Sequence, residues 1–279
     1  MHSAVSNNKQ YHIACGPGDL TDHLLVPGDP ERVPRIAKSW DSAKEVSSHR
    51  EFCSYTGKYK GVPISALSSG IGPACMAIAV NESSNIGVNT FIRVGSTGAI
   101  QKSIACGDLI ISSAAVRLDG TSNCYVMPEY PAVASYEVLL ALIEAAESLN
   151  IRKYHVGVVA TTSDFYAGQN RALAKTCSSN TENMLPTLQK AGVLSFDMET
   201  ATLYTLAGLY GLRAASVCAV YANRLTSEFK PGEGEENAIS IANEAVKILH
   251  EWDAVKRRRS RQWLFPSLAQ TPKPKAIRP

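Results

Sequence analysis

Residues 214–222 read AASVCAVYA, a run of nine residues with almost no polar side chain. A run of this length without polar alternation is typical of a central strand that is covered on both faces of a sheet. Similar apolar runs precede it at residues 23–26, 63–67, 90–94, 109–116 and 155–161. We therefore expect a β-sheet with residues 214–222 near its centre.

Helical patterns lie between and after these runs. Apolar residues recur at steps of three and four in residues 136–149 and again in residues 236–252. This spacing gives a helix one apolar face. Strands that alternate with helices are typical of the α/β class. The sequence therefore predicts a single α/β domain with a central mixed β-sheet, mainly parallel, flanked by helices.

The chain is expected to have one folded domain between two flexible ends. We expect residues 1–10 to be a flexible N-terminus and residues 11–253 to form the domain. Residues 254–279 are basic and contain four prolines, which predicts a disordered tail. Truncation after Asp253 should then leave folding and catalysis nearly unchanged. The polar segment 175–190 is expected to be a surface excursion.

Composition excludes several classes of protein. With 45% hydrophobic and 19% charged residues, the chain is not of the disordered class. No run of 18 apolar residues is present and the first ten residues are polar, so neither a transmembrane helix nor a secretory signal peptide is expected. Seven scattered cysteines without a CxxC pair indicate reduced thiols and a cytoplasmic protein.

Charge is unevenly distributed along the chain. The net charge is +3, but residues 256–279 contain eight basic residues and no acidic ones. Residues 1–255 carry the remaining 20 basic and 25 acidic residues, a net charge of −5. A mildly acidic body does not indicate nucleic-acid binding.

Two glycine turns each carry an arginine. VPGDPERV (26–33) reads as a strand end, a turn and a helix start. There Gly28 would let a ligand approach the backbone, and Arg32 would emerge where helix amides favour an anion. FIRVGSTGAI (91–100) places Arg93 inside a strand, where a buried guanidinium needs an anionic partner. Phosphate fits this need, and an internal carboxylate is the alternative that this segment alone leaves open.

Known nucleotide and metal motifs are missing. The chain has neither a GxxxxGK[ST] loop nor a GxGxxG fingerprint, which favours free phosphate over ATP or NAD as the anion. No HxxxH or HExxH pair is present, so no metal site is expected.

Six segments carry a resemblance to a known family. They are VPGDPERV (26–33), SSHREF (47–52), RVGSTGAI (93–100), VRLDG (116–120), FYAGQNR (165–171) and DMETATL (197–203). In order and spacing, these segments resemble the bacterial uridine phosphorylases of the trimeric and hexameric nucleoside phosphorylase family. The resemblance covers residues from about 10 to 252.

The resemblance implies a set of site residues. Inorganic phosphate would be held by Gly28, Arg32, Arg93 and Ser96, and by Arg50 from a neighbouring subunit. The ribose would contact Glu199 and Met198, and His12 of the neighbour would reach the 5′-hydroxyl. The base would contact Phe165, Gln169, Arg171 and Tyr221. The residues that would carry catalysis are Arg93, Gln169 and Arg171.

Side-chain chemistry is consistent with these implied roles. A carboxylate such as Glu199 can accept hydrogen bonds from two vicinal hydroxyls, although an exposed glutamate at a helix start is the ordinary alternative. Gln169 offers a donor and an acceptor to the polar edge of uracil, and Arg171 offers only donors. A QxR pair in a loop is otherwise ordinary surface polarity.

Several positions depart from the family pattern. Ser96 and Asp197 stand where the bacterial relatives usually carry Thr and Glu, which should tune the site without abolishing it. Tyr221 replaces an aliphatic residue near the base. Cys75 replaces a serine that helps to bind potassium at the dimer interface of the bacterial relatives, while Glu51 is retained.

The resemblance implies phosphorolysis of uridine to uracil and ribose 1-phosphate in pyrimidine salvage, with weaker action on deoxyuridine and thymidine. It implies a homo-oligomer, a hexamer built as a trimer of dimers, that needs no organic cofactor. We expect partners to be limited to these small molecules, without nucleic acid or membrane.

Other functions remain open. A purine nucleoside phosphorylase is disfavoured because Asn223 stands where those relatives carry a proton-donating aspartate. A hydrolytic nucleosidase would not need the arginines. A catalytically idle nucleoside-binding relative is a further alternative, as is a separate role for the basic tail in contacting RNA, acidic lipid or a receptor.

Overall fold

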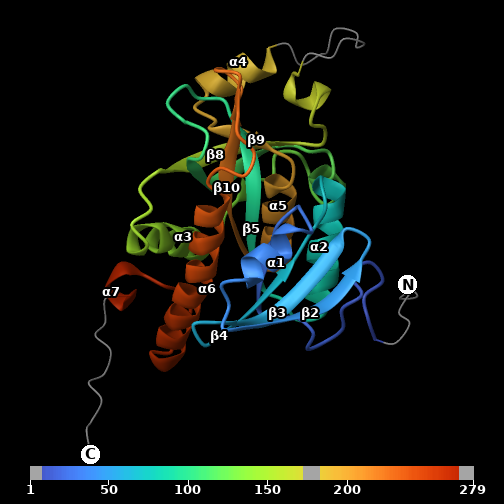
Figure 1. The fold of residues 1–279 in the computed structure, drawn as a ribbon, viewed down its shortest axis with the longest axis vertical. Coiled ribbons are helices and arrows are strands. Elements are labelled where there is room, and N and C mark those ends of the chain that lie inside the picture. Colours follow the sequence, from blue (N-terminus) through green and yellow to red (C-terminus); the bar gives the residue numbers. More distant parts are fainter. Residues whose placement is uncertain (1–7, 172–182, 270–279) are drawn as a thin grey trace, which may run out of the picture.

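The computed structural model describes residues 8–171 and 183–269 (Figure 1). Its strands are β1 (His23–Val26), β2 (Ser42–His49), β3 (Phe52–Tyr59), β4 (Val62–Leu67), β5 (Thr90–Ala99), β6 (Leu109–Leu118), β7 (Ala132–Val133), β8 (Tyr154–Thr162), β9 (Ser195–Asp197), β10 (Arg213–Asn223) and β11 (Glu228–Phe229). Its α-helices are α1 (Arg32–Ala37), α2 (Pro73–Asn85), α3 (Tyr136–Ser148), α4 (Met184–Lys190), α5 (Thr200–Tyr210), α6 (Glu235–Arg258) and α7 (Pro266–Ala269). Two short 3-10 helices are η1 (Ser122–Cys124) and η2 (Ala167–Gln169).

All these strands join one mixed sheet. Its order is β11-β10-β6-β8-β9-β5-β1-β4-β3-β2, with β7 paired to β6. Because β10 also pairs with β5, the strands β5, β10, β6, β8 and β9 form a closed ring. The predicted single α/β domain with a central mixed sheet is confirmed. The sheet is not mainly parallel, because five of its described strand pairs are parallel and six are antiparallel.

Strand β10 occupies the position expected from its sequence. It pairs in parallel with β5 and antiparallel with β6. All but its first residue and Tyr221 are buried. Because this strand has neighbours on both edges and is covered on both faces, no side of it faces water. Its side chains are therefore apolar on both faces, which explains the apolar run.

Helices cover the sheet in two pairs. Helix α3 packs on α6, and α2 packs on α5 (Figure 1). The first eight residues of α5 are all buried, because this helix lies between α2 and the strands β6, β8 and β10. The first turn of α5 is thereby fixed, and it carries residues of the site described below.

The structure differs from the expected domain boundary after residue 253. Helix α6 continues to Arg258, and Lys256 places its Nζ 2.5 Å from the buried Glu137 carboxylate. Beyond the helix, Leu264 and Leu268 are buried. The basic segment is folded here because Glu137 needs a cationic partner and the two leucines cover apolar surface.

Parts of the other boundary predictions lie outside the described residues. These are residues 1–7 of the expected flexible N-terminus, 175–182 of the surface excursion and 270–279 of the tail. Within the excursion, residues 184–190 form α4, and Met184, Leu185 and Leu188 pack against a small cluster around Phe196. Among the described helices, none is long and apolar enough to cross a membrane.

Candidate active site

A cavity of about 710 Å³ opens where the carboxyl ends of parallel strands meet. Strands β1, β5 and β10 run in parallel, and an edge of this kind is a common place for ligand binding in α/β proteins. The cavity is lined by Gly28, Asp29, Pro30, Arg32, Glu51, Gly70, Ile71, Cys75, Arg93, Gly95, Ser96, Thr97, Gly98, Phe165, Gln169, Arg171, Phe196, Asp197, Met198, Glu199, Tyr221, Ala222 and Phe229.

Most of the predicted site residues share this cavity. Those that line it are Gly28, Arg32, Arg93, Ser96, Phe165, Gln169, Arg171, Met198, Glu199 and Tyr221. They come from segments spread over nearly 200 positions of the chain, and the parallel register gathers them at one edge. Their shared location agrees with the predicted site, while the role of each residue stays a prediction.

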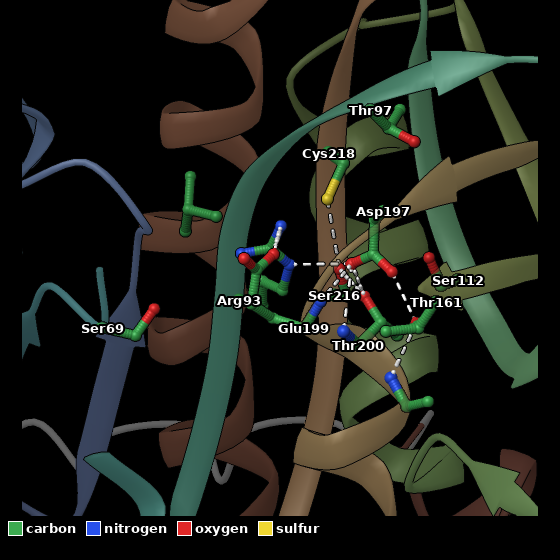
Figure 2. Close-up of polar contacts among 12 residues, drawn as sticks. Ser69, Arg93, Thr97, Ser112, Thr161, Asp197, Glu199, Thr200, Ser216 and Cys218 are labelled. Carbon is green, nitrogen blue, oxygen red and sulfur yellow. Dashed lines mark hydrogen bonds and ion pairs between the residues drawn. The ribbon is translucent and has the colours of Figure 1, made fainter. Parts of the chain in front are cut away.

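Arg93 sits at the buried end of the cavity. Its Nε donates to Asp197 Oδ2 at 3.1 Å, and its Nη2 lies 2.5 Å from Glu199 Oε2 (Figure 2). Burial opposes the charge, but the carboxylates of Glu199 and Asp197 outweigh it, so the pKa of Arg93 is raised. Among the described residues, its buried Nη1 has no hydrogen-bond partner. Arg93 therefore has both an internal carboxylate pair and a donor left over for a bound anion.

Glu199 lies just before α5 and is 4% exposed. Its Oε1 accepts a hydrogen bond from Gly72 N–H at 2.6 Å, while Oε2 faces Arg93. The alternative of an exposed glutamate at a helix start is therefore excluded. A fixed, buried carboxylate on a cavity wall can accept further hydrogen bonds from hydroxyl groups of a ligand.

Asp197 holds this end of the site together, a role that the sequence analysis did not assign to it. Thr161 Oγ1 donates to its Oδ1, and Thr200 donates to its Oδ2 from both the backbone N–H and the hydroxyl (Figure 2). Arg93 also donates to Oδ2. A buried carboxylate at a helix N-terminus could have been flagged by its place directly before the apolar helix.

Arg32 opens α1 and is 5% exposed. Its Nε donates to Glu235 Oε2 at 2.8 Å and its Nη2 donates to the Tyr221 hydroxyl at 3.2 Å. At nearby Gly28 a Cβ would lie 3.2 Å from the Gly70 carbonyl oxygen, which is a tight contact. Gly28 lines the cavity with its backbone, and its role in binding a ligand stays a prediction.

Phe165, Gln169 and Arg171 meet on another part of the cavity wall. The Arg171 guanidinium carbon lies 4.0 Å from the Phe165 ring centroid, a cation–π geometry. Burial lowers the pKa of Arg171, and its buried Nε has no hydrogen-bond partner within the described part of the chain. Gln169 is 3% exposed. The alternative that Gln169 and Arg171 are ordinary exposed polar residues of a loop is therefore excluded.

Arg224 is a neighbour of this pair that sequence reasoning missed. Its Nη2 donates to the Gln169 carbonyl oxygen at 2.9 Å. Burial and the charge of Arg171 lower the pKa of Arg224 to about 10. Its buried Nη1 is unpartnered among residues 8–171 and 183–269. The sequence position of Arg224 could have indicated its place near the site. It directly follows the apolar strand β10, at the end of the sheet where the cavity lies.

Arg50 and His12 lie outside the cavity. The Arg50 guanidinium carbon is 5.7 Å from the Tyr11 ring centroid. His12 Nδ1 is 2.6 Å from Glu82 Oε1, and the His12 backbone N–H also donates to Glu82. Within one chain these two side chains do not join the other predicted site residues.

Three further positions bear on the predictions. Cys75 and Glu51 both line the cavity, and the Cys75 thiol donates to Glu51 Oε1 at 3.5 Å. Asn223 donates from Nδ2 to the carbonyl oxygens of Gln101 and Ile104, away from the cavity lining. No group of three or more metal-ligating side chains exists within the described residues. The described cysteines are all unpaired thiols.

The fold and this cavity define an α/β protein with a binding cavity lined by the cationic side chains of Arg32, Arg93 and Arg171. Comparison with known proteins refines the class. The model of the phosphorylase superfamily matches residues 22–251, and the chain therefore belongs to that superfamily.

Similar proteins include a uridine phosphorylase of Thermococcus kodakarensis, 58% identical over 93% of both chains. The uridine phosphorylase of Escherichia coli is 38% identical over 88% of this chain and 100% of its own. A guanosine phosphorylase of Halorubrum lacusprofundi is 34% identical over 86% of this chain and 94% of its own. The relatives thus include proteins named for a pyrimidine and for a purine nucleoside.

Proposed function

We propose that this protein is a pentosyltransferase that catalyses the reversible phosphorolysis of uridine to uracil and ribose 1-phosphate, a step of pyrimidine salvage. It acts more weakly on deoxyuridine and thymidine. The similarity to the uridine phosphorylases of Thermococcus kodakarensis and Escherichia coli supports this proposal. The observation that carries it is one cavity that joins Arg32 and Arg93 to Gln169 and Arg171.

Phosphate is proposed to bind among Gly28, Arg32, Arg93 and Ser96. The free Nη1 of Arg93 is a buried donor that has no partner among the described residues. A buried donor without a partner is costly, and a phosphate oxygen would relieve that cost. The presence of Gly28 in the same cavity lining as Arg32, Arg93 and Ser96 supports this placement.

The nucleoside is proposed to bind beside this anion. Glu199 accepts hydrogen bonds from the ribose hydroxyls and Met198 packs against the sugar. Phe165 packs on uracil, while Gln169 and Arg171 bind its polar edge and Tyr221 limits the space beside it. All of these residues line the cavity.

The chemical step follows from this placement. Phosphate attacks the sugar carbon as the glycosidic bond breaks, and the electron pair of that bond leaves with uracil. Charge grows on the uracil carbonyl oxygens only as the bond breaks, so a cationic donor such as Arg171 binds the transition state more strongly than the substrate. Arg93 holds the phosphate against the sugar, which orients the two reactants. The step uses no organic cofactor or metal.

The active form is proposed to be a homo-oligomer, a hexamer built as a trimer of dimers. Arg50 and His12 of a neighbouring subunit would complete the phosphate and ribose sites. Their position outside the cavity of their own chain supports this arrangement. The unpaired cysteines support a reducing compartment such as the cytoplasm.

A turnover assay with uridine, thymidine and inosine, each with and without phosphate, tests the proposal. We expect phosphate-dependent release of uracil, slower release of thymine, and little reaction with inosine. Arg93→Met should abolish turnover. The control Arg152→Ala should not, because Arg152 is an exposed arginine that pairs with Glu147 and does not line the cavity. Activity on inosine alone, or activity without phosphate, would show that the proposal is wrong.

A further inference from the structure

Tyr221 and Glu235 meet at the guanidinium of Arg32. The Tyr221 hydroxyl donates to Glu235 Oε2 at 2.5 Å and accepts from Arg32 Nη2 at 3.2 Å. Arg32 Nε donates to the same carboxylate oxygen at 2.8 Å. These three groups therefore form a closed triangle of hydrogen bonds in which each group touches the other two.

The second oxygen of Glu235 is also engaged. Arg35 Nε lies 3.2 Å from Glu235 Oε1, and Arg35 Nη2 lies 2.7 Å from Asp29. Glu235 itself begins α6, directly after Gly234 in the left-handed region. The carboxylate is thus anchored by its helix and by a second arginine, and it offers a fixed point to Arg32.

The triangle leaves Arg32 with donors to spare. Its Nη1 donates to the Val94 carbonyl oxygen at 3.1 Å. A guanidinium has five N–H donors, and the three bonds to described residues leave one N–H on Nη1 and one on Nη2. These two terminal N–H groups match the fork with which arginine binds two oxygens of a phosphate.

The hydroxyl of Tyr221 prevents a competing arrangement. Arginine and a carboxylate pair most strongly through two parallel N–H···O bonds. Here Oε2 is shared by Nε and the tyrosine hydroxyl, and Oε1 is held by Arg35. Arg32 therefore makes only one bond to Glu235. Without the hydroxyl, Nη2 could turn toward the carboxylate, and its donor would be lost to an anion.

Protonation keeps the triangle in one state near neutral pH. Burial, with the hydrogen bond to Glu235, raises the pKa of Tyr221 to about 12. Burial opposes ionisation of Glu235, but the bonds from Tyr221 and Arg32 outweigh it and lower its pKa. The proton therefore stays on the tyrosine, which donates to a charged carboxylate.

We propose that Tyr221 and Glu235 are positioning residues that aim the Arg32 guanidinium at phosphate. The Tyr221 side chain lines the cavity, and its hydroxyl accepts a hydrogen bond from Arg32, so it links the cavity wall to this arginine. This inference rests on the proposed function, since it assigns Arg32 to phosphate.

Tyr221→Phe tests the inference with the smallest change, because it keeps the ring and removes only the hydroxyl. We expect the KM for phosphate to rise about three- to tenfold, the size of effect that follows the loss of one ordinary hydrogen bond. The KM for uridine should rise by a smaller factor than the KM for phosphate, because the ring that lines the cavity is kept. Glu235→Asp, which withdraws the carboxylate, should shift the KM for phosphate in the same direction.

Tyr59→Phe is the matched control. The Tyr59 hydroxyl donates to Glu244 Oε2 at 3.1 Å, and Lys60 Nζ donates to the same oxygen. This is a similar tyrosine–glutamate–cation group whose glutamate also lies on α6, but none of the three residues lines the cavity. Tyr59→Phe should leave both KM values unchanged. In an Arg32→Met background, Tyr221→Phe should have no further effect on phosphate binding, because its target is gone.

Phosphate-dependent thermal stabilisation, measured without nucleoside, separates this inference from the proposed function. A protein that is stabilised by phosphate but does not cleave uridine would overturn the function, and Tyr221→Phe would still be expected to weaken the stabilisation. If Tyr221→Phe instead raises only the KM for uridine, or weakens phosphate binding equally in the Arg32→Met background, the positioning role is wrong.

Discussion

Arg93 has both kinds of partner that its sequence position allows: internal carboxylates, and a free donor that could bind an anion. An arginine inside an apolar strand needs either an internal carboxylate or a bound anion. The structure supplies two carboxylates, Asp197 and Glu199, and still leaves Nη1 without a partner among the described residues. The internal pair fixes the guanidinium in place before any ligand arrives. Preorganisation of this kind is what allows a donor to stabilise charge without rearrangement.

Arg171 and Gln169 should differ in how they affect catalysis. Arg171→Ala should lower kcat on uridine by roughly 10²-fold or more, because its charge acts on the leaving uracil in the transition state. Gln169→Ala should mainly raise KM, since a neutral amide binds the base almost equally in both states. Steady-state kinetics with Arg152→Ala as control measure both effects. A wild-type kcat for Arg171→Ala would place the pair away from the leaving group.

His23 should make stability depend on pH. Burial, with the nearby charge of Arg213, lowers its pKa from 6.5 to about 4, and its Nε2 has no partner among the described residues. The unfolded chain binds this proton at a higher pH than the folded one. The contribution of His23 to the free energy of unfolding is therefore fully present above pH 6.5. It is lost as the pH falls toward 4 and amounts to on the order of 3 kcal/mol.

Denaturant unfolding of the wild type and of His23→Leu between pH 4 and 7 measures this effect. The carboxylates of Glu137 and Asp253 also titrate on the acid side, so the difference between the two proteins is the informative quantity. The variant should lose less stability than the wild type across the window. Parallel curves would mean that His23 does not titrate as expected.

At the scale of elements, the end of α6 is a structural part of the domain. Lys256 and Arg213 both approach Glu137, and the Leu264 N–H donates to the same carboxylate at 3.0 Å. Glu137 is 6% exposed. Removing residues after Asp253 would take away two of these partners and leave a buried carboxylate poorly compensated.

Truncation after Asp253 should therefore destabilise the protein by about 3 kcal/mol or more, contrary to the expectation from sequence. Truncation after Ala269 is the matched control, because it keeps every contact described for α6 and α7. Guanidinium unfolding of the two shortened chains measures the difference. Equal stability would mean that the segment 254–269 contributes nothing to the folded domain.

The sequence predicts elements well where burial fixes the pattern of apolar residues. The apolar run at 214–222 became β10, and the helical spacing at 136–149 became α3. Strand β2 was not predicted because it is largely exposed and its sequence alternates weakly. Strand β3 was not predicted because only its residues Phe52 and Ser54 are buried. The end of α6 was missed for another reason. Lys256 reads as a surface charge until Glu137, 119 positions away, is known to face it.

At the scale of the whole molecule, the site depends on contacts that sequence alone cannot place. Motifs and resemblance identified most of the cavity wall, from Gly28 to Tyr221. Glu235 was missed because nothing near it in sequence shows that Arg32, 203 positions away, lies beside it. A sequence motif can identify residues that contact a ligand. The residues that orient those side chains, such as Glu235, become known only when the fold shows which side chains are in contact.

The last prediction concerns sites shared between subunits. If Arg50 and His12 serve a neighbour, each site combines Glu199 of one chain with Arg50 and His12 of another. Arg50→Ala and Glu199→Ala proteins should each be nearly inactive alone. In a reassembled equal mixture, half of the dimers are mixed, and each mixed dimer has one intact site, so about a quarter of wild-type activity should return.

Arg50→Ala mixed with His12→Ala is the matched control. Both residues would come from the same neighbour, so every site in a mixed dimer lacks one of them and no activity should return. Activity after unfolding and reassembly of the two mixtures is the measurement, with light scattering to confirm the assembly. Recovery in both mixtures, or in neither, would show that Arg50 and His12 do not complete the site of a neighbouring subunit. Recovery only in the first would mean that the isolated chain holds an incomplete site, and that assembly is a condition of catalysis.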